Sequence, residues 1–425
     1  MSNEEKAALM PKLRFPEFRG GEGWQLAPLS QLATRTKQKN RDENITRVLT
    51  NSAEFGIMDQ RDFFDKDIAT QGNLESYFVV ELGSYVYNPR ISTTAPVGPI
   101  SKNKIGTGVM SPLYTVFKFK DENNELYEHY FKTTGWHTYM RQASSTGARH
   151  DRMAISSDDF MAMPLPISTP KEQQKIADCL SSLDELIAAQ AGKVDALKTH
   201  KKGLMQQLFP REGETQPRLR FPEFVDASSW AIGKLEDLAR RGSGHTPSKS
   251  SPEYYGGGVK WVSLADSKRL DDGLIAETET EISELGIKHS SAVLHPAGTV
   301  LISRDAGVGK SAVMAVPMAV SQHFIVWVCD GQKLSNWFLY YLLQLMKPIF
   351  ERIATGSTIK TIGLPFFKDL CVSVPSLPEQ QRIADCLTSL DTLITTATQE
   401  LETLKTHKKG LMQQLFPPVD NEVQA

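Results

Sequence analysis

The stretch EQQKIADCLSSLDELIAAQAGKVDALKTHKKGLMQQLFP, from Glu172 to Pro210, returns as EQQRIADCLTSLDTLITTATQELETLKTHKKGLMQQLFP, from Glu379 to Pro417. The two copies are identical at 27 of 39 positions and lie 207 residues apart, about half of the 425-residue chain. A shorter block also occurs twice, as PKLRFPEF from Pro11 and PRLRFPEF from Pro217. Between the short block and the long copy, the two halves diverge almost completely. The sequence therefore predicts a repeated scaffold that carries two different heads.

Both long copies carry the pattern of a coiled-coil helix. In the first copy, apolar residues step alternately by four and three from Ile176 to Leu208, with Gln190 and Lys201 as the exceptions. The second copy repeats these steps from Ile383 to Leu415. A heptad seam of this length is typical of helices packed along each other rather than of a helix on a globular core. At the α-helical rise, each helix would be about 58 Å long.

The ends of both helices are marked by residues that start and stop helices. Thr169 and Ser376 each stand three residues before a glutamate, Glu172 and Glu379. This is the spacing of a capping box, in which two side chains satisfy the free N–H groups of the first turn. A proline follows the last phenylalanine of each copy and predicts the end of the helix.

Two residue types stand out inside the helices, each at the same position in both copies. Lys201 and Lys408 occupy seam positions, where a lysine either extends its ammonium out to solvent or fixes the register between the helices. Gly203 and Gly410 each cost about 1 kcal/mol relative to alanine. Their presence in both copies predicts a close approach, either of the two helices to each other or of a partner subunit.

Chain order fixes how the helices would run. The first helix leaves the first head and ends where the second head begins, so a second helix packed on it must run back toward the first head. We therefore expect an α+β protein with two mixed α/β heads joined by two long antiparallel coiled-coil helices with pseudo-twofold symmetry. The predicted segments are residues 1–168 for the first head, 169–210 for the first helix, 211–375 for the second head, 376–417 for the second helix and 418–425 for a C-terminal tail.

The heads have similar patterns without similar sequences. Short β-branched and aromatic runs between turn residues predict strands in both, such as SPLYTVFKF at 111–119 and SQHFIVWVCD at 321–330. Each head also has a predicted helix late in the segment, at 124–142 in the first and 336–353 in the second. The order of the elements is the same in both heads. This favours one fold that carries two different binding surfaces.

Polar turns follow those late helices at matching places, at 141–152 and 352–360. Their Arg, Lys, Ser, Thr and Gln side chains are of the kind that contact phosphates and base edges of DNA, although composition alone equally allows solvated loops. Together with other polar positions, they give the candidate DNA contacts. In the first head these are Arg90, Ser92, Thr93, Lys102, Lys104, Arg141, Gln142, Ser144, Ser145, Thr146, Arg149, His150 and Arg152. In the second head they are His245, Thr246, Lys249, Arg304, Lys310, Gln322, His323, Thr355, Ser357, Thr358 and Lys360.

Composition and charge exclude several classes of protein. No apolar run is long enough to span a bilayer, and the first residues lack the apolar block of a signal peptide, so we expect a cytoplasmic protein. The four cysteines form no CxxC pair and predict buried thiols rather than disulfides or a metal site. The formal net charge of −2 gives no general attraction to nucleic acid. DNA binding would therefore depend on local basic clusters.

Motifs for catalysis are missing. The run AGVGKS at 306–311 ends like a phosphate-binding loop, but Arg304 stands where that motif needs its first glycine. The run also lies between two predicted strands, which favours a glycine hairpin. No dinucleotide-binding GxGxxG, no methyltransferase tetrapeptide, no nuclease signature and no metal-ligand spacing occur. These absences favour a binding subunit without catalytic residues or bound metal.

Two variable segments alternating with two nearly identical helices resemble the specificity subunit of type I restriction-modification enzymes. The blocks IADCLSSLDELI, KTHKKGLMQQLFP and PRLRFPEF carry the resemblance, which covers essentially the whole chain. It implies that each head is a target recognition domain that binds one half of a bipartite asymmetric DNA site. It also implies that the helices set the distance between the half-sites and dock two methyltransferase subunits, which restriction subunits then join.

The same resemblance implies that this chain has no cofactor of its own. S-adenosylmethionine, ATP and magnesium are expected in the partner subunits, which methylate adenine and translocate and cleave DNA. The expected partners are double-stranded DNA, two methyltransferase subunits and, through that core, restriction subunits. With its net charge of −2, the chain alone should bind DNA weakly.

Two other functions are open from the sequence. The chain could be a coiled-coil adaptor whose heads bind proteins, including an antirestriction or scaffolding role. It could also be an autonomous nuclease or methyltransferase, against which the missing motifs argue. The recognised bases cannot be read from the heads, because heads of this type have no simple code that relates residues to bases.

Overall fold

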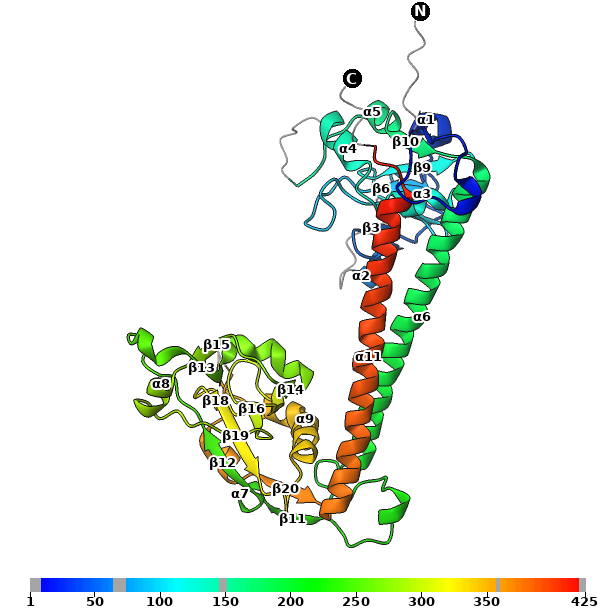
Figure 1. The fold of residues 1–425 in the computed structure, drawn as a ribbon. Helices are drawn as coiled ribbons and strands as arrows, with labels where there is room; N and C mark the ends of the chain where they lie inside the picture. The colour runs from blue at the N-terminus through cyan, green and yellow to red at the C-terminus, as the bar shows by residue number, and fades with distance from the viewer. Residues whose placement is uncertain (1–8, 64–73, 145–150, 357–359, 420–425) are drawn as a thin grey trace, which may run out of the picture. The chain divides into compact units, whose positions relative to one another are not determined.

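The computed structural model describes residues 9–63, 74–144, 151–356 and 360–419. The chain forms two compact units: unit 1 consists of residues Met1–Gln190 and Glu400–Ala425, and unit 2 of Ala191–Gln399. Each unit therefore contains one head and a portion of both long helices, coloured green and red to orange in Figure 1. No helix in the described ranges is both long and apolar enough to cross a bilayer.

The repeated segments form the two longest helices, as the sequence predicts. Helix α6 spans Pro170–Leu208 and helix α11 spans Leu377–Leu415, with 39 residues each. Seam residues from both are buried, including Ile176 and Leu180 in unit 1 and Ile383 and Leu387 in unit 2. The heptad pattern thus marks the buried face of each helix.

In both units the two helices run antiparallel, and a lysine–aspartate pair joins them. In unit 2, Lys201 Nζ donates to Asp391 Oδ1 at 2.5 Å. In unit 1, Lys408 forms an ion pair with Asp184. Lys201 and Lys408 are repeat mates, and so are Asp184 and Asp391, so one lysine–aspartate contact occurs twice. Of the two roles predicted for the seam lysines, the contacts support fixing the register.

The glycines inside the helices do not mark a close approach of the two helices. A Cβ added at Gly203 or at Gly410 would meet no atom within 4 Å. That half of the prediction is wrong, because side chains on the neighbouring helix fill the seam and leave these flanks open. A close approach by a partner subunit stays a prediction.

The short repeated block joins each head to both helices. Arg14 donates from Nε and Nη2 to the two oxygens of Glu172 at 2.6 and 2.7 Å. Arg220 donates in the same way to Glu379 at 2.8 and 2.6 Å. Such bidentate pairs are strong and directional. Burial raises the pKa of Glu172, but the Arg14 guanidinium outweighs this effect and holds that pKa below its usual range.

These contacts modify the predicted capping box. The hydroxyl of Thr169 accepts from the backbone N–H of Glu172 at 3.3 Å, as a cap should. The glutamate side chain, however, accepts from Arg14 and from the hydroxyl of Ser168 instead of bonding the backbone N–H of Thr169. At the other end of the helices, Leu13 N–H donates to the carbonyl of Gln414 at 2.9 Å and Leu219 N–H to that of Gln207 at 3.0 Å. Each block therefore contacts the start of one helix and the end of the other.

The two heads share a sheet in which equivalent strands occur in the same order. In unit 1 this sheet has the order β2-β9-β6-β7, and in unit 2 β12-β19-β16-β17-β14. All neighbours pair antiparallel except β14 and β17, which are parallel. A two-stranded sheet next to the helices also recurs, as β1-β10 and β11-β20. The prediction of one fold in both heads is thus confirmed at the level of strand order.

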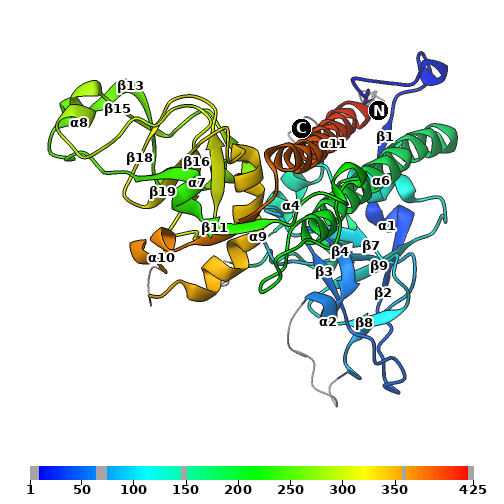
Figure 2. The ribbon, with the colours of Figure 1, turned by 90° about the horizontal axis from the view of Figure 1, so that it is seen from below.

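The strands of unit 1, several of which are labelled in Figure 2, are β1 Gln25–Pro28, β2 Ala33–Thr36, β3 Leu49–Ser52, β4 Gly56–Asp59, β5 Phe78–Val80, β6 Tyr85–Tyr87, β7 Ile100–Lys102, β8 Gly108–Met110, β9 Thr115–Phe119 and β10 Pro164–Ile167. Its short helices are η1 Pro16–Phe18, α1 Leu29–Leu32, α2 Gln60–Phe63, α3 Glu125–Tyr130, α4 His137–Ala143 and α5 Ser157–Met161. Strands β3-β4 and β5-β8 form two further two-stranded sheets.

The strands of unit 2 are β11 Ala231–Lys234, β12 Ala239–Ser243, β13 Tyr255–Val262, β14 Leu274–Ile275, β15 Thr280–Ile282, β16 Val300–Ser303, β17 Ser311–Met314, β18 Ala319–Val320, β19 Phe324–Cys329 and β20 Cys371–Val374. Its helices within the head are η2 Pro222–Phe224, α7 Leu235–Leu238, η3 Pro252–Tyr254, η4 Leu264–Asp272, α8 Glu284–Lys288, α9 Asn336–Ile353 and α10 Leu364–Lys368. Strands β15-β13-β18 form a separate three-stranded sheet.

The late helix of the first head differs from its prediction. The range 124–142 holds two short helices, α3 and α4, whereas α9 in the second head is continuous. Thr133 donates its hydroxyl to the carbonyl of Tyr130 at 2.7 Å, and buried Trp136 donates its indole N–H to the carbonyl of Phe131 at 3.2 Å. These side-chain bonds satisfy carbonyls that a continuing helix would use, so the helix ends and restarts.

Two smaller predictions have different outcomes. The AGVGKS run is the turn between antiparallel β16 and β17, which confirms a glycine hairpin. The cysteines are free thiols, but only three of them are partly covered, and Cys371 is exposed. Buried thiols were therefore a wrong prediction for Cys371, because its strand β20 has one face open to solvent.

The late helices also contact the long helices through matched polar groups. His129 of α3 lies 3.1 Å from the hydroxyl of Ser181 through Nε2, and its Nδ1 lies 3.8 Å from Asp184. In unit 2, the hydroxyl of Tyr341 lies 3.1 Å from that of Thr388 and donates to Asp391 at 2.8 Å. Ser181 and Thr388 are repeat mates. Two unrelated aromatic side chains therefore contact the same repeated positions.

Candidate nucleic-acid interface

In both heads, the same two loops are joined to each other. In the first head, the loop after β6 meets the loop after α4: Met153 N–H donates to Pro89 O at 2.9 Å, and Ile91 N–H donates to Asp151 O at 3.1 Å. In the second head, the loop after β16 meets the loop after α9, where Ile362 N–H donates to Arg304 O at 3.0 Å. We call residues 88–94 with 151–153 the paired loops of the first head, and residues 304–310 with 354–356 and 360–362 the paired loops of the second head.

The paired loops of the first head bring together three predicted DNA contacts. Arg90 and Arg152 are bridged through their backbones, and Ser92 lies two residues beyond Arg90. Arg90 is exposed, whereas the side chain of Arg152 is 24% exposed and lies 3.5 Å from Asp151. The predicted contacts Ser145, Thr146, Arg149 and His150 lie outside the described residues.

A polar cavity of about 470 Å³ opens beside these loops. Arg90, Ser92, Asn51 and Asn88 are among the residues that line it. Asn51 donates its amide to the carbonyl of Val86 at 2.8 Å, while its side-chain oxygen is buried and has no partner in the described part of the chain. An acceptor left in this state is costly unless a ligand or water satisfies it. Sequence reasoning missed Asn51, which lies within β3, and Asn88, which follows β6, because neither belongs to a motif.

A network of polar side chains joins the paired loops of the second head to residues 322–323. His323 Nδ1 lies 2.7 Å from the carboxylate of Asp305, which also accepts from the hydroxyl of Thr361. Gln322 accepts from Thr246 at 2.5 Å. The structure therefore places the predicted contacts Thr246, Gln322 and His323 together. It adds Asp305 and Thr361, which the sequence analysis missed because their partners are distant in the chain.

A basic cavity of about 560 Å³ lies at the glycine hairpin of the second head. Lys310, Lys347 and Lys360 line it together with Gly307. Gly307 has a φ of +98°, which side chains rarely adopt, so a glycine is needed for this turn. Lys310 also donates to Asp271 at 2.7 Å, so part of its charge is neutralised within the head. Glu351 also lines the cavity and lies 3.9 Å from Lys347, which leaves Lys360 with Lys310 as the lysines best placed for a phosphate group.

The other predicted contacts take no part in these side-chain networks and cavities. Lys102 pairs with Glu125 at 2.9 Å and Lys104 with Glu128 at 2.8 Å, which gives both lysines partners on α3. Burial raises the pKa of Glu125, but the Lys102 ammonium outweighs this and lowers that pKa below its usual value. The remaining described residues are at the surface or partly covered. They are Thr93, Arg141, Gln142, Ser144, His245, Lys249 and Thr355, while Ser357 and Thr358 lie outside the described residues.

The geometry defines a class of protein. It has two heads of one fold with different polar surfaces, and each head is attached to an antiparallel pair of repeated helices. None of the described residues forms a cluster of three or more histidine, cysteine or carboxylate side chains that could hold a metal ion. This arrangement is suited to binding two different sites.

Comparison with known proteins shows which proteins this chain resembles. Residues 227–406 match the type I restriction modification DNA specificity domain. The MjaIX specificity subunit of Methanocaldococcus jannaschii is 30% identical over 178 residues, which cover 41% of this chain and 41% of that relative. The MjaVIII specificity subunit of the same organism is 25% identical over 326 residues, covering 74% of this chain and 71% of the relative.

Solved structures support the fold. A chain solved in work on complex assembly and conformational transition of the type I R-M system has a TM-score of 0.57 and 16% identity, and the match covers 93% of this chain and 98% of that one. The S subunit from M. genitalium also has a TM-score of 0.57, with 14% identity and coverage of 96% and 99%. Residues 227–406 are thus similar to the type I restriction modification DNA specificity domain, and the fold of the chain is that of these two solved chains. Specificity subunits are non-catalytic, and other subunits carry out methylation and cleavage.

Proposed function

We propose that this chain is the DNA-reading subunit of a type I restriction-modification complex and that each head binds one half of a bipartite asymmetric site. The observation that carries the proposal is the repetition of one strand order and one pair of joined loops with different side chains. A shared fold places both loop pairs in equivalent positions, and unlike side chains present different donors and acceptors to base edges. Two unlike half-sites are the expected target.

Within each head, the polar groups divide into two roles. Gln322 and His323 are suited to base edges, because the contacts with Thr246 and Asp305 hold both side chains in place. The lysine-lined cavity is suited to the phosphate backbone, which positions a protein on DNA without reading its sequence. In the first head, Arg90 and the polar cavity beside it take the corresponding place.

The helices supply the remaining functions in this proposal. Two methyltransferase subunits dock on the repeated helices, and restriction subunits join that core in the cytoplasm. The chain binds no cofactor of its own, while S-adenosylmethionine, ATP and magnesium belong to the partners. The target expected for two such heads is a pair of half-sites on one duplex with untouched base pairs between them. The repetition of the helix contacts in both units supports two equivalent docking sites.

Exchange of one head tests the proposal. Replacing residues 217–375 with the corresponding head of another specificity subunit should change one half of the methylated motif and leave the other half unchanged, because each head acts separately. Sequencing of methylated bases in cells that carry the chain and its methyltransferase subunit measures the motif. The matched control replaces residues 11–168 and should change the opposite half. A motif that changes in both halves, or no methylation with the unaltered chain, would contradict the proposal.

A further inference from the structure

A continuous series of hydrogen bonds connects five polar side chains of the second head. The carboxylate of Asp305 accepts from the hydroxyl of Thr361 and lies 2.7 Å from Nδ1 of His323. Nε2 of His323 lies 3.4 Å from Nε2 of Gln322. At the other end of the series, Oε1 of Gln322 accepts from the hydroxyl of Thr246 at 2.5 Å. We call these five residues the Asp305 network.

The direction of the hydrogen bonds in this network follows from the carboxylate. An ionised carboxylate only accepts hydrogen bonds, so His323 donates to Asp305 from Nδ1. A neutral imidazole with its proton on Nδ1 has a lone pair on Nε2. An N–H satisfies that lone pair and a carbonyl oxygen does not. The amide atom of Gln322 beside His323 is therefore its nitrogen, and the oxygen faces Thr246.

The amide of Gln322 is held on both sides and still has hydrogen-bonding capacity left. Its oxygen has two lone pairs, of which Thr246 uses one, and its nitrogen has two hydrogens, of which His323 uses one. Within residues 9–63, 74–144, 151–356 and 360–419, no further partner of this amide occurs. The residue is exposed. Gln322 thus offers one acceptor and one donor to a ligand, in an orientation that its neighbours fix.

An acceptor beside a donor matches the major-groove edge of adenine. Adenine presents a donor at N6 and an acceptor at N7, and a glutamine amide binds both at once. Guanine presents two acceptors, cytosine a donor, and thymine an acceptor beside a methyl group, so none of them offers the same pair. A rotated amide would place oxygen against N7 and N–H against N6. Fixing the orientation before binding therefore favours adenine.

The Asp305 network is not part of the fold that the two heads share. The first residues of β2 and of β12 pair with the last residues of β9 and of β19, which aligns the two heads. Counted back from those last residues, Pro112 and Leu113 occupy the places of Gln322 and His323. Neither side chain can form these hydrogen bonds. The network is therefore a feature by which the heads differ, as expected for a group that distinguishes two half-sites.

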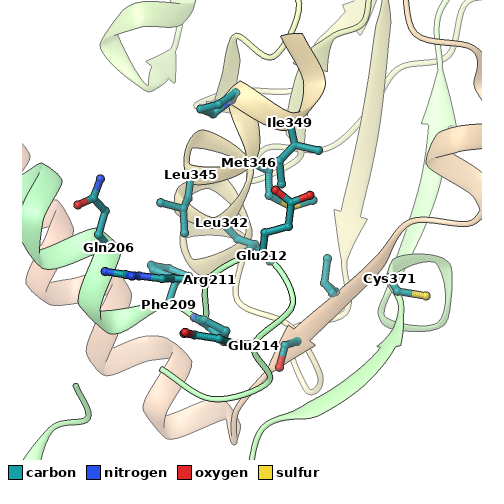
Figure 3. Close-up of a pocket in the computed structure, with 14 residues that line it drawn as sticks. Gln206, Phe209, Arg211, Glu212, Glu214, Leu342, Leu345, Met346, Ile349 and Cys371 are labelled. Carbon is teal, nitrogen blue, oxygen red and sulfur yellow. The ribbon is translucent and has the colours of Figure 1, made fainter. Parts of the chain in front are cut away.

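The apolar cavity of unit 2 offers no comparable pattern. It has a volume of about 500 Å³, and Figure 3 shows Leu345 and Met346 of α9 and Phe209 at the end of α6 in its lining. Glu212, which also lines it, pairs with Arg352 at 2.6 Å. A mostly apolar lining does not distinguish base pairs, whose edges differ in donors and acceptors. The Asp305 network is the better candidate for reading a base.

We propose that Gln322 reads an adenine in the half-site bound by the second head, and that Asp305 and His323 position its amide for this contact. The inference rests on the proposed function, in which the second head binds one half-site. The adenine is not the methylated one, because a base must leave the stack to be methylated. Gln322 determines specificity in this scheme. Asp305 is a positioning residue, because it acts on the amide through His323.

Truncation of the amide tests the contact in cells that also carry the methyltransferase subunit. Sequencing of methylated bases should show that Gln322→Ala lets one A·T position in the half-site of the second head accept other base pairs, while the first half stays unchanged. The control Gln332→Ala removes another exposed glutamine of the second head and should leave the motif unchanged. A second half-site without an A·T pair besides the methylated one would contradict the inference.

Base analogues separate the two hydrogen bonds without altering the protein. Unsubstituted purine lacks the N6 amine of adenine, and 7-deazaadenine lacks the N7 acceptor. Each analogue is placed in turn at every adenine of the half-site except the methylated one, and binding by the complex with methyltransferase subunits is measured. At one position, each should weaken binding by the unaltered complex about fivefold or more and leave binding by the Gln322→Ala complex unchanged. Elsewhere the analogues should affect both complexes equally.

Replacement of the carboxylate tests the positioning role. Asp305→Asn introduces an amide that can donate to Nδ1 of His323 as well as accept from it, so the direction of the series is lost. Discrimination between adenine and its analogues should fall, although the complex still binds DNA. Nitrogen NMR of the chain with isotope-labelled histidine, at mildly alkaline pH, should show the proton of His323 on Nδ1 in the unaltered chain and on either nitrogen in the variant. The control Thr361→Val keeps the carboxylate and should keep the proton on Nδ1.

The outcomes separate this inference from the function on which it rests. A Gln322→Ala complex that methylates the original motif and stays sensitive to both analogues would overturn the inference alone. A His323 proton on Nε2 in the unaltered chain, or an Asp305→Asn variant that unfolds at a lower temperature with unchanged discrimination, would overturn the positioning role. An unaltered complex that recognises no bipartite motif would overturn the proposed function as well.

Discussion

At the residue scale, ion pairs and hydrogen bonds from a histidine and a tyrosine attach the heads to the helices. Glu172 is fully buried and bound by Arg14, and Glu379 is bound by Arg220 in the same manner. His129 and Tyr341 add a second contact between head and helix in each unit. The heads have diverged almost everywhere else. These contacts therefore join each head to equivalent positions of the repeated helices.

His129 makes the stability of unit 1 depend on pH. Burial, with the nearby charges of Lys408 and Lys132, lowers the pKa of His129 to about 4, against the opposing effects of Glu128 and Asp184. In the unfolded chain this histidine takes up a proton near pH 6.5, whereas in the folded chain it stays neutral at that pH. Its contribution to the free energy of unfolding is therefore complete above pH 6.5 and is lost as the pH falls toward 4. We expect a loss of about 2 kcal/mol between pH 7.5 and 5 from this residue.

Denaturant unfolding at the two pH values measures this loss. His129→Tyr, which installs the side chain of the second head, should remove most of the additional loss because tyrosine does not titrate in this range. His289→Tyr is the control, since His289 is exposed and should retain the full pH dependence. An unchanged pH dependence in the His129 variant would show that other groups are responsible.

At the element scale, the helices combine a seam that sets their register with ends that contact the heads. The two copies are nearly identical toward both ends, where the paired aspartates and lysines and the contacts with the short block occur. They differ in the middle, near Gln190 and Glu400, which form a hydrogen bond at 2.9 Å between the helices. The middle is consequently the place where length can be changed without disturbing a head.

Insertion of one heptad in the middle of each long helix should change the distance between the two DNA half-sites. Seven residues added after Gln190 and seven before Glu400 preserve the seam and lengthen each helix by about 10 Å, close to the rise of three base pairs of duplex DNA. Sequencing of methylated bases should find the same two half-sites with a longer gap. Insertion of five residues breaks the heptad and is the control that should reduce methylation. A lengthened chain that keeps the original gap would count against a spacer role.

At the scale of the whole molecule, the small negative net charge limits the affinity of the isolated chain for DNA. With a formal charge of −2 and many lysines paired internally, the isolated chain should bind its target more weakly than the complex with methyltransferase subunits. We expect a difference of about tenfold or more at physiological salt. Titration of labelled duplex at several salt concentrations measures both affinities. Equal affinity and equal salt dependence would contradict the need for partners.

The sequence by itself determined the long helices, the glycine hairpin and the presence of two heads with the same order of elements. These features follow from periodicity and turn residues, which act over a few positions in the chain. Tertiary structure decided the break between Tyr130 and His137, the bonds from Arg14 to Glu172, and the contact of Asp305 with His323. The first depends on where a buried tryptophan packs. The other two are contacts between side chains that only folding brings together, so no local sequence pattern predicts them.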